Sequence, residues 1–455
     1  MLYCHIVRLL TIQQFNNVTM KKIIIILLII VVIFGAYLFS SDFGGEFTES
    51  IKRFMGYNIP IFTKQPTTDS DNDLPFLNLP EGFKISVVAK GLENPRVVTF
   101  DPKSRMLISE TKAGRVSVLE GDSFETKRTL IENLKSPHGL DFYKDPKTGI
   151  TYLYIAETHQ VARYSYNINA GKLNSVTGEN ITKLPTDGGH FTRTIAFGHN
   201  FRTSQIVSGI SDINTQIGTK LYIGVGSSCD ICEESTWKRA AILESDPEGN
   251  YTAEFAGGLR NSVFFTFHPL TKEIWATEMG RDNLGDDFPP DEINIIKVAG
   301  TEHKFGARRY GWPFCYGNKV QDQKFKPDKW ERIDVTNDCS QTEAPVIEIP
   351  AHSAPLGLVF IPPGRGWPQE WEGDLLVALH GSWNRSEPTG YKIVRYDLDR
   401  NGNVLSQKSV DFVTGWISEN KKNIYGRPVD LKFGPDDALY ISDDSAEMIY
   451  RMFPK

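Results

Sequence analysis

The sequence predicts an all-β protein, a six-bladed β-propeller preceded by an N-terminal transmembrane helix or signal anchor. Three observations predict it: one strand–turn–strand pattern recurs, the composition suits short strands, and an uncharged apolar segment stands near the N-terminus. The 455 residues include 38 Gly and 25 Pro, and 11% are aromatic. Gly and Pro weaken helices but suit turns, whereas aromatic residues favour strands. Propellers reach this length as one domain because each blade adds to a shared ring.

The first expected element is a helix that crosses a membrane. The segment from Ile23 to Phe39 carries no charge and is just long enough to span the hydrocarbon core of a bilayer. Two lysines directly before it favour a cytoplasmic location for residues 1–22. Because Met20 directly precedes those lysines, residues 1–19 are interpreted as an extension upstream of the true start.

A cleavable signal peptide is the alternative for this segment, since both kinds of segment have a charged start and an apolar core. No clear cleavage site follows, which favours the anchor. Both alternatives export the rest of the chain. We therefore expect a membrane-anchored protein whose folded domain lies on the extracytoplasmic side, periplasmic or extracellular.

The next expected element is a linker over residues 40–78. This stretch is rich in Ser, Thr, Asp, Asn, Gly and Pro and shows no sustained hydrophobic periodicity. The folded domain is expected over residues 79–455.

Within that domain one pattern recurs six times: a strand ending in Phe, usually a turn with Pro, then a second apolar strand ending in small or acidic residues. The paired segments are VVTFDP and MLISE, GLDFYKDP and YLYIAE, TIAFGHN and KLYIGVG, VFFTFHP and EIWATE, GLVFIPP and DLLVALH, and DLKFGPD and ALYISDD. The anchoring aromatic residues are Phe100, Phe142, Phe197, Phe267, Phe360 and Phe433. Hairpins recur in any β-rich protein, but six matched copies favour six blades, whose loops tolerate irregular spacing.

The five cysteines indicate how the exported part is cross-linked. Cys4 lies outside the folded domain, Cys229 and Cys232 form a C-x-x-C pair, and Cys315 and Cys339 flank a polar stretch. An oxidising compartment favours two disulfides, Cys229–Cys232 and Cys315–Cys339. A zinc site is the alternative and would require all four to converge.

Polar or cationic residues stand at the start of each innermost strand, just before the anchoring Phe. They are Arg96, His138, His190 with Arg193, Arg260 with Asn261, His352 with Ser353, and Arg427. Equivalent positions of the blades lie at one end of the central channel, so these side chains are expected to share one space. Gathered cations repel one another, and a bound anion would relieve the repulsion. A single arginine near a turn is explained as well by a surface charge, so the hypothesis depends on the recurrence.

His190 differs from the other axial residues because Gly188 and Gly189 precede it and allow the backbone to approach closely. A histidine in such a place suits a general base, since it titrates near neutral pH. A structural, hydrogen-bonded histidine is the alternative.

The stretch EMGRDNLGDDFPPDEIN, over residues 278–294, gathers carboxylates and glycines in one loop. Hard oxygen ligands on a kinked backbone suggest calcium. The spacing is not that of an EF-hand, so backbone carbonyls would have to contribute ligands. A solvated acidic loop is the alternative.

Seven blocks of the sequence resemble the glucose/sorbosone dehydrogenase family, in particular its sorbosone and pyranose dehydrogenase branch. The blocks are GGHFTRT, GLRNS, EMGRDNLGDD with PPDEIN, YGWPFCYG, AHSAPLGLVF, HGSWNRSEPTGYKIVRY, and YGRPVD with ALYISDD. Members of this family are six-bladed quinoproteins that use pyrroloquinoline quinone (PQQ) and Ca²⁺. The resemblance extends from about Leu79 to the C-terminus.

The resemblance implies roles for individual residues. His190 corresponds to the catalytic base, Arg260 to a catalytic cation, and Asn261 to its neighbour beside the quinone. Arg427 corresponds to a ligand of a cofactor carboxylate, and Asp444 to a further polar cofactor contact.

Further cofactor contacts are expected from Arg96, from Arg193, and from His138, which replaces a glutamine of that branch. Gly280 and Arg281 correspond to the positions whose main-chain carbonyls hold the calcium ion. The family's lysine from the fifth blade has no clear counterpart, and within HGSWNR either Arg385 or His380 is expected to replace it.

The implied chemistry follows from charge. PQQ carries three carboxylates, which explains an arginine-lined axis. Calcium would polarise the quinone, His190 would take the proton of the alcohol, and Arg260 would stabilise developing negative charge. The implied function is a PQQ-dependent dehydrogenase that oxidises a sugar or a sugar-derived aldehyde or alcohol.

The expected partners are a small sugar, the membrane and an external electron acceptor, a cytochrome or a quinone, because no C-x-x-C-H haem motif is present. The net charge of −6 provides no basic surface for nucleic acid. Two other functions remain open: a non-catalytic binding propeller, and a calcium-dependent propeller hydrolase or lactonase.

Overall fold

The computed structural model of the chain describes residues 60–63, 65, 74–201, 219–298, 307–325 and 338–455. The predicted anchor over residues 23–39 lies outside these ranges and stays a prediction. In the described part of the chain, no helix has the length and apolarity needed to cross a membrane.

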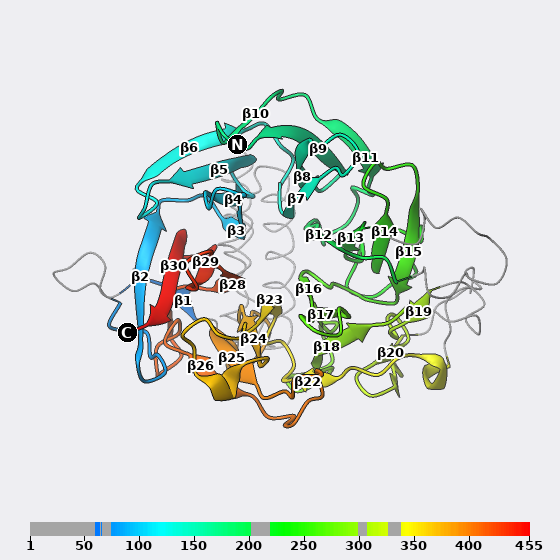
Figure 1. Cartoon of the computed structure of the whole chain (residues 1–455). Helices are drawn as coiled ribbons and strands as arrows, with labels where there is room; N and C mark the ends of the chain where they lie inside the picture. The colour runs from blue at the N-terminus through cyan, green and yellow to red at the C-terminus, as the bar shows by residue number, and fades with distance from the viewer. Residues whose placement is uncertain (1–59, 64, 66–73, 202–218, 299–306, 326–337) are drawn as a thin grey trace, which may run out of the picture. The chain divides into compact units, whose positions relative to one another are not determined.

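Six sheets, antiparallel except for one added strand in the third, are arranged in a ring around a central axis, which confirms the six-bladed, all-β fold (Figure 1). The first blade consists of β3 (Pro95–Phe100), β4 (Met106–Glu110), β5 (Arg115–Glu120) and β6 (Thr126–Ile131). The second consists of β7 (Leu140–Lys144), β8 (Thr151–Glu157), β9 (Gln160–Asn167), β10 (Lys172–Leu173) and β11 (Glu179–Lys183). The third consists of β12 (Ile195–His199), β13 (Thr219–Val225), β14 (Ala241–Ser245), β15 (Thr252–Gly257) and the parallel β19 (Arg308–Arg309).

The other three blades repeat this plan. The fourth consists of β16 (Phe265–Phe267), β17 (Ile274–Glu278), β18 (Asp291–Ile296) and β22 (Ile347–Ile349). The fifth consists of β23 (Pro355–Phe360), β24 (Leu375–Leu379), β25 (Lys392–Tyr396) and β26 (Val410–Val413). The sixth consists of β28 (Pro428–Phe433), β29 (Leu439–Asp443), β30 (Met448–Pro454) and β2 (Phe83–Lys90). The loops add the two-stranded sheet of β20 (Cys315–Tyr316) and β21 (Val320–Gln321), and the 3₁₀ turns Cys339–Gln341 and Gln369–Trp371.

Strands from the two ends of the propeller close the ring. Strand β2, the first strand of the six blades, pairs antiparallel with β30, the last, from Phe83 opposite Pro454 to Lys90 opposite Met448. Backbone hydrogen bonds therefore join strands from both ends of the propeller within the sixth blade.

Part of the predicted linker belongs to this folded unit. Strand β1 (Ile61–Phe62) pairs in parallel with β27 (Asn423–Ile424), and Leu74 and Leu77 lie in the hydrophobic core. The structure therefore places the start of the domain before Leu79. The reason is that a few apolar residues in a polar segment find partners that are distant in sequence, in β27 and in the core formed by residues of the fifth and sixth blades.

All six anchoring phenylalanines lie on innermost strands, and four of them join neighbouring blades. Each of these four contacts an aromatic ring on the second strand of the preceding blade. The ring centroids are 5.1 Å apart for Phe100–Tyr440, 4.8 Å for Phe197–Tyr154, 5.8 Å for Phe267–Tyr222 and 5.4 Å for Phe360–Trp275. Such a pair stabilises by about 0.5–1.5 kcal/mol beyond its buried area, so the repeat in the sequence also holds the blades together.

Candidate functional site

The polar residues predicted to share one space stand where the chain enters the innermost strands β3, β7, β12, β16, β23 and β28. All blades have the same strand order, so these starts face the same end of the ring (Figure 1). The structure connects the residues into two hydrogen-bonded groups. One is built around Arg96 and Arg427, and the other around His190 and Arg260.

The first group is a chain of four side chains. Arg96 Nη1 donates to Asp444 Oδ2 at 2.6 Å, and His380 Nε2 lies 2.9 Å from Asp444 Oδ1. Arg427 Nη1 lies 3.4 Å from His380 Nδ1. An arginine only donates and a carboxylate only accepts, so His380 is neutral with its proton on Nε2. Burial lowers the pKa of His380, and the neighbouring His380 and Arg96 hold the pKa of Asp444 well below its usual range.

Arg427 and Arg96 retain capacity to bind an anion. Among the described residues the guanidinium of Arg427 has no carboxylate partner, and its Nη2 donates to the Tyr391 hydroxyl at 3.0 Å. Its guanidinium carbon lies 5.1 Å from the centroid of the Tyr391 ring. Arg96 Nε is buried and has no hydrogen-bond partner in the described part of the chain. An anion at the axis would find one unpaired cation and one unused buried donor.

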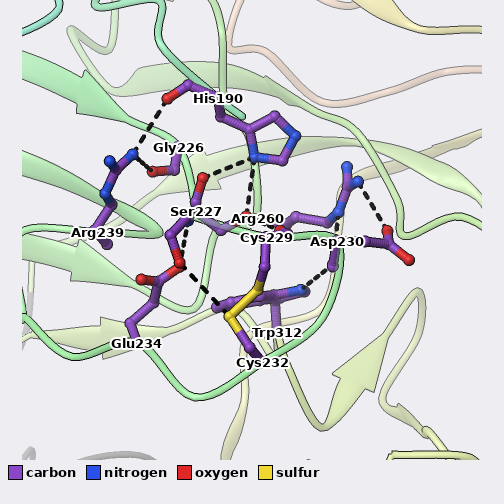
Figure 2. Close-up of a disulfide and its surroundings, with 11 residues drawn as sticks. His190, Gly226, Ser227, Cys229, Asp230, Cys232, Glu234, Arg239, Arg260 and Trp312 are labelled. Carbon is purple, nitrogen blue, oxygen red and sulfur yellow. Dashed lines mark hydrogen bonds and ion pairs between the residues drawn. A yellow bond between two sulfur atoms is a disulfide. The ribbon is translucent and has the colours of Figure 1, made fainter. Parts of the chain in front are cut away.

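His190 belongs to the second group (Figure 2). Its Nδ1 lies 3.0 Å from the carbonyl oxygen of Ser227 and 2.9 Å from Ser227 Oγ. Ser227 Oγ in turn donates its proton to the carbonyl of Cys229 at 2.5 Å. Both partners of His190 Nδ1 are therefore acceptors, which requires the proton on Nδ1. Nε2 is then unprotonated, and no described residue hydrogen-bonds to it.

The charge state of His190 is set by its surroundings. Burial and the cation of Arg260 lower the pKa of His190 to about 4, with Arg239 acting in the same direction. The Ser227 carbonyl and Asp230 oppose this shift. At neutral pH the imidazole is uncharged, and its Nε2 can accept a proton.

Arg260 is fixed by acceptors on two loops. Its Nε donates to the carbonyl oxygen of Asp230 at 2.9 Å, and its Nη2 lies 2.9 Å from Asp230 Oδ1 and 3.4 Å from Asp282 Oδ2. Asp282 is held in turn by Asn384, whose Nδ2 donates to Oδ1 at 2.5 Å. Asn261 follows Arg260, and its backbone N–H donates to Glu278 Oε1 at 2.9 Å. The pair predicted to flank a cofactor is thus preorganised.

The buried carboxylates of the 278–294 stretch serve as internal clamps. Asp291 accepts from the backbone N–H groups of Gly280 and Ala354, both at 2.9 Å, and burial raises the pKa of Asp291 to about 7. Arg281 Nη1 pairs with Asp322 Oδ2 at 2.8 Å. The main-chain carbonyls of Gly280 and Arg281 accept no hydrogen bond from any described residue. These two oxygens are therefore available as ligands for a hard cation.

Within the part of the chain that the structure describes, the other predicted site residues make no side-chain to side-chain hydrogen bond with the members of either group. Arg193 is fully buried and donates to the carbonyls of Pro185, His190 and Thr192 at 2.7–2.9 Å, so it supports the backbone that carries His190. Arg385 Nη2 pairs with Asp287 Oδ1 at 2.8 Å.

His138 is fully buried, and its Nδ1 lies 3.2 Å from Thr194 Oγ1. Burial and Arg96 hold the pKa of His138 well below its usual value.

The predicted ring of unneutralised cations is corrected in one respect. Arg96 is paired with Asp444, and Arg260 with Asp230 and Asp282. The repulsion expected among the arginines is thus largely relieved by the protein's own carboxylates. Sequence reasoning missed Ser227 and Asp230, although Asp230 stands inside the C-x-x-C motif, which could have drawn attention to it.

Both predicted disulfides are present. Cys229–Cys232 lies beside His190 and Arg260 (Figure 2), and Cys315–Cys339 closes a loop that follows the fourth blade's third strand. Within the described ranges, no cluster of metal-ligand side chains includes both cysteine pairs, so the zinc alternative is not supported.

The sequence of this chain is similar to a known protein family and to several known proteins. Residues 77–453 match the model of a family described as TrAA12-like. An uncharacterized protein from Borreliella burgdorferi is 30% identical over 83% of this chain and 90% of its own length. A pyrroloquinoline quinone-dependent pyranose dehydrogenase from Coprinopsis cinerea is 24% identical over 82% of this chain, which spans 54% of that relative's length.

Solved structures share the fold. A Trichoderma reesei protein of carbohydrate-active enzyme family AA12 superposes with a TM-score of 0.66 and 21% identity, covering 86% of this chain and 100% of that one. The holo form of the pyranose dehydrogenase PQQ domain from Coprinopsis cinerea gives a TM-score of 0.64 and 21% identity, with 86% and 100% covered. These matches confirm the resemblance inferred from the sequence blocks.

Proposed function

Since this chain belongs to the TrAA12-like family, we propose that its propeller is a quinoprotein dehydrogenase that oxidises a sugar or a sugar-derived alcohol or aldehyde with PQQ and Ca²⁺. The observation that carries the proposal is the state of His190. It is uncharged at neutral pH, it holds its proton on Nδ1, and its Nε2 is unpaired beside the fixed cation of Arg260.

The axial residues fit a polycarboxylate cofactor. The guanidinium of Arg427 lacks an anionic partner among the described residues, and Arg96 Nε is an unused buried donor. Charge-assisted hydrogen bonds from these two arginines would hold carboxylates of PQQ. Asn261 and Asp444 would make further polar contacts. PQQ, when bound, supplies the acceptor for the two electrons taken from the substrate.

His190 would act as the general base. Its Nε2 accepts the hydroxyl proton of the substrate, and the resulting imidazolium keeps both acceptors at Nδ1. Arg260, held by Asp230 and Asp282, contributes a positive charge that need not reorganise as negative charge develops nearby.

Calcium is proposed from the free carbonyls of Gly280 and Arg281. Backbone oxygens are ligands that Ca²⁺ accepts, and Asp291 fixes the orientation of the Gly280 peptide through its N–H. When bound, calcium supplies a Lewis acid.

The proposal also includes the cellular compartment of the domain and its electron acceptor. The disulfides fit an oxidising compartment, and we propose that the domain is anchored on the extracytoplasmic side of a membrane by residues 23–39. Electrons would leave to an external cytochrome or quinone.

A dye-linked activity screen tests the proposed function. Purified protein would be offered aldoses, ketoses and aldosones with Ca²⁺, in the presence and in the absence of PQQ. Sugar-dependent dye reduction that requires PQQ supports the proposal. Equal rates with and without PQQ, or no rate with any sugar, would contradict it.

The pH dependence of turnover should show a base with a lowered pKa. Burial and Arg260 lower the pKa of His190, so the base stays unprotonated to a lower pH than an ordinary histidine of pKa 6.5. We expect kcat/KM of the reconstituted enzyme to be lost only as the pH falls below 6.5 towards about 4. An acid limb at or above pH 6.5 would disagree with the electrostatics of this site.

A further inference from the structure

The Cys229–Cys232 disulfide closes a short loop, and the segment from Ser227 to Cys232 that contains this loop contacts both residues of the proposed catalytic pair (Figure 2). Ser227 precedes the first cysteine and contacts His190, and Asp230 follows it and contacts Arg260. The two contacts are therefore linked through only a few residues of chain.

On the His190 side, the loop determines which ring nitrogen is protonated. Ser227 offers two oxygens to Nδ1, at 3.0 and 2.9 Å. The hydroxyl acts as an acceptor because its own proton is donated to the carbonyl of Cys229 at 2.5 Å. The position of the Cys229 carbonyl therefore fixes the direction of the Ser227 hydroxyl proton, and with it the role of Ser227 Oγ as an acceptor for His190 Nδ1.

On the Arg260 side, the loop supplies a two-point clamp. The carbonyl oxygen of Asp230 accepts from Arg260 Nε at 2.9 Å, and Oδ1 accepts from Nη2 at 2.9 Å. The same carbonyl oxygen accepts from Trp312 Nε1 at 3.2 Å, and Oδ1 accepts from the backbone N–H of Asp282 at 2.7 Å. Asp230 is thus held by groups that also surround Arg260.

The loop also packs closely on the segment that leads to His190. The N–H of Gly189 donates to the carbonyl of Ser228 at 3.0 Å, and a Cβ added at Gly188 would lie 2.3 Å from Ser228 Cα. The N–H of Ser228 donates in turn to the buried carboxylate of Glu234 at 2.5 Å. Glycine is therefore needed at position 188, since any side chain there would displace the loop.

We propose that the disulfide-closed loop is the positioning element of the active site, with Ser227 orienting His190 and Asp230 orienting Arg260, so that one cross-link aligns the base and the cation. This inference rests on the proposed dehydrogenase function. Ser227 and Asp230 are positioning residues, because they act through His190 and Arg260.

The two disulfides of the domain close loops of different length, and this difference allows the positioning role to be tested. Cys229 and Cys232 are separated by three positions in sequence, whereas Cys315 and Cys339 are separated by 24. A disulfide that closes a longer loop removes more entropy from the unfolded chain. The Cys315–Cys339 bond should therefore contribute more to stability, and the Cys229–Cys232 bond more to catalysis.

The experiment compares three variants of the full chain, reconstituted with PQQ and Ca²⁺. They are the double variant Cys229→Ser/Cys232→Ser, the control Cys315→Ser/Cys339→Ser, and Ser227→Ala. We expect opening of the first disulfide to lower kcat by about 10- to 100-fold with little change in KM, since displacements near 1 Å cost that much. The control should lower the Tm further while keeping kcat.

Two readouts separate positioning from general loss of structure. Ser227→Ala removes an acceptor from Nδ1, which destabilises the imidazolium, so the acid limb of kcat/KM should move to lower pH. Combining Ser227→Ala with the opened disulfide should cost little more than the opened disulfide alone, because both act on the same contact.

The outcomes distinguish the two claims. An inactive wild-type protein would refute the proposed function itself. An active wild type with unchanged kcat in both Ser227→Ala and the opened loop would refute the positioning role alone. If the double variant does not fold, Ser227→Ala decides: an unaltered rate and acid limb would overturn the inference.

Discussion

Replacing His190 with Gln is expected to lower kcat by about 10²–10⁴-fold, the range that a general base contributes. Gln keeps the size of the side chain and a donor for the Ser227 oxygens, but it has no nitrogen that takes a proton near neutral pH. The loss should therefore fall on the chemical step, while the affinity for PQQ stays unchanged. Stopped-flow turnover and a PQQ titration would measure the two effects separately.

Two variants serve as comparisons for this result. His199→Gln changes an exposed histidine at the other end of the same innermost strand, β12, and should keep kcat. Arg427→Ala should weaken PQQ binding by about 10- to 100-fold, since a hydrogen bond to a charged group contributes about 1.5–3 kcal/mol. A His190→Gln protein that turns over at the wild-type rate would show that the base is another residue.

Removal of PQQ and calcium is expected to lower the turnover rate by at least about 10³-fold. The reason is that the cofactor and the electrostatic stabilisation of the transition state together lower the activation barrier. Dialysis against a chelator should remove the ion proposed to bind the carbonyls of Gly280 and Arg281, and readdition of Ca²⁺ with PQQ should restore the rate. Ligand binding to the folded state should also raise the Tm of the reconstituted protein. Dye-linked assays before and after readdition measure the effect.

A distinct pattern would count against the calcium site. If PQQ alone restores full turnover in the presence of chelator, the carbonyls of Gly280 and Arg281 hold no essential ion. Mg²⁺ serves as the comparison ion, because it demands tighter octahedral geometry than Ca²⁺.

The number of blades could be predicted from the sequence because each blade contains the same strand–turn–strand pattern within a short stretch of chain. The anchoring residues, from Phe100 to Phe433, all lie on innermost strands, and four of them contact an aromatic ring of the preceding blade. The pairing of β2 with β30 could not be predicted, since its two strands are separated by almost the whole domain. The same reason hid the contacts of Leu74 and Leu77, which are made with distant blades.

The cations of the site could be predicted, but the carboxylates that pair with them could not be assigned as their partners. Arg96 and Arg427 could be identified because a polar or cationic residue stands before each anchoring Phe. Asp444, the partner of Arg96, is 348 positions away, and Asp282 reaches Arg260 from another loop. Only the folded ring shows that these charges are paired, and that Arg427 keeps its charge unpaired among the described residues.

The tautomer and the pKa of His190 could not be predicted from the sequence either. GGHFTRT indicates a histidine close to the backbone, but its tautomer depends on Ser227 and on the proton that Ser227 gives to Cys229. Its lowered pKa depends on Arg260 and on burial. The membrane anchor over residues 23–39 stays a prediction, because it lies outside the described ranges.

The most direct measurement of the central claim is the absorbance of protein-bound PQQ after anaerobic addition of one equivalent of an oxidisable sugar. We expect the band of the oxidised quinone to disappear in the wild-type protein at a rate that matches turnover. In His190→Gln the same band should form on PQQ binding but fade about 10²–10⁴-fold more slowly. A wild-type band that does not respond to any sugar, or a variant band that fades at the wild-type rate, would contradict the assignment of His190 as the base of a PQQ-dependent dehydrogenase.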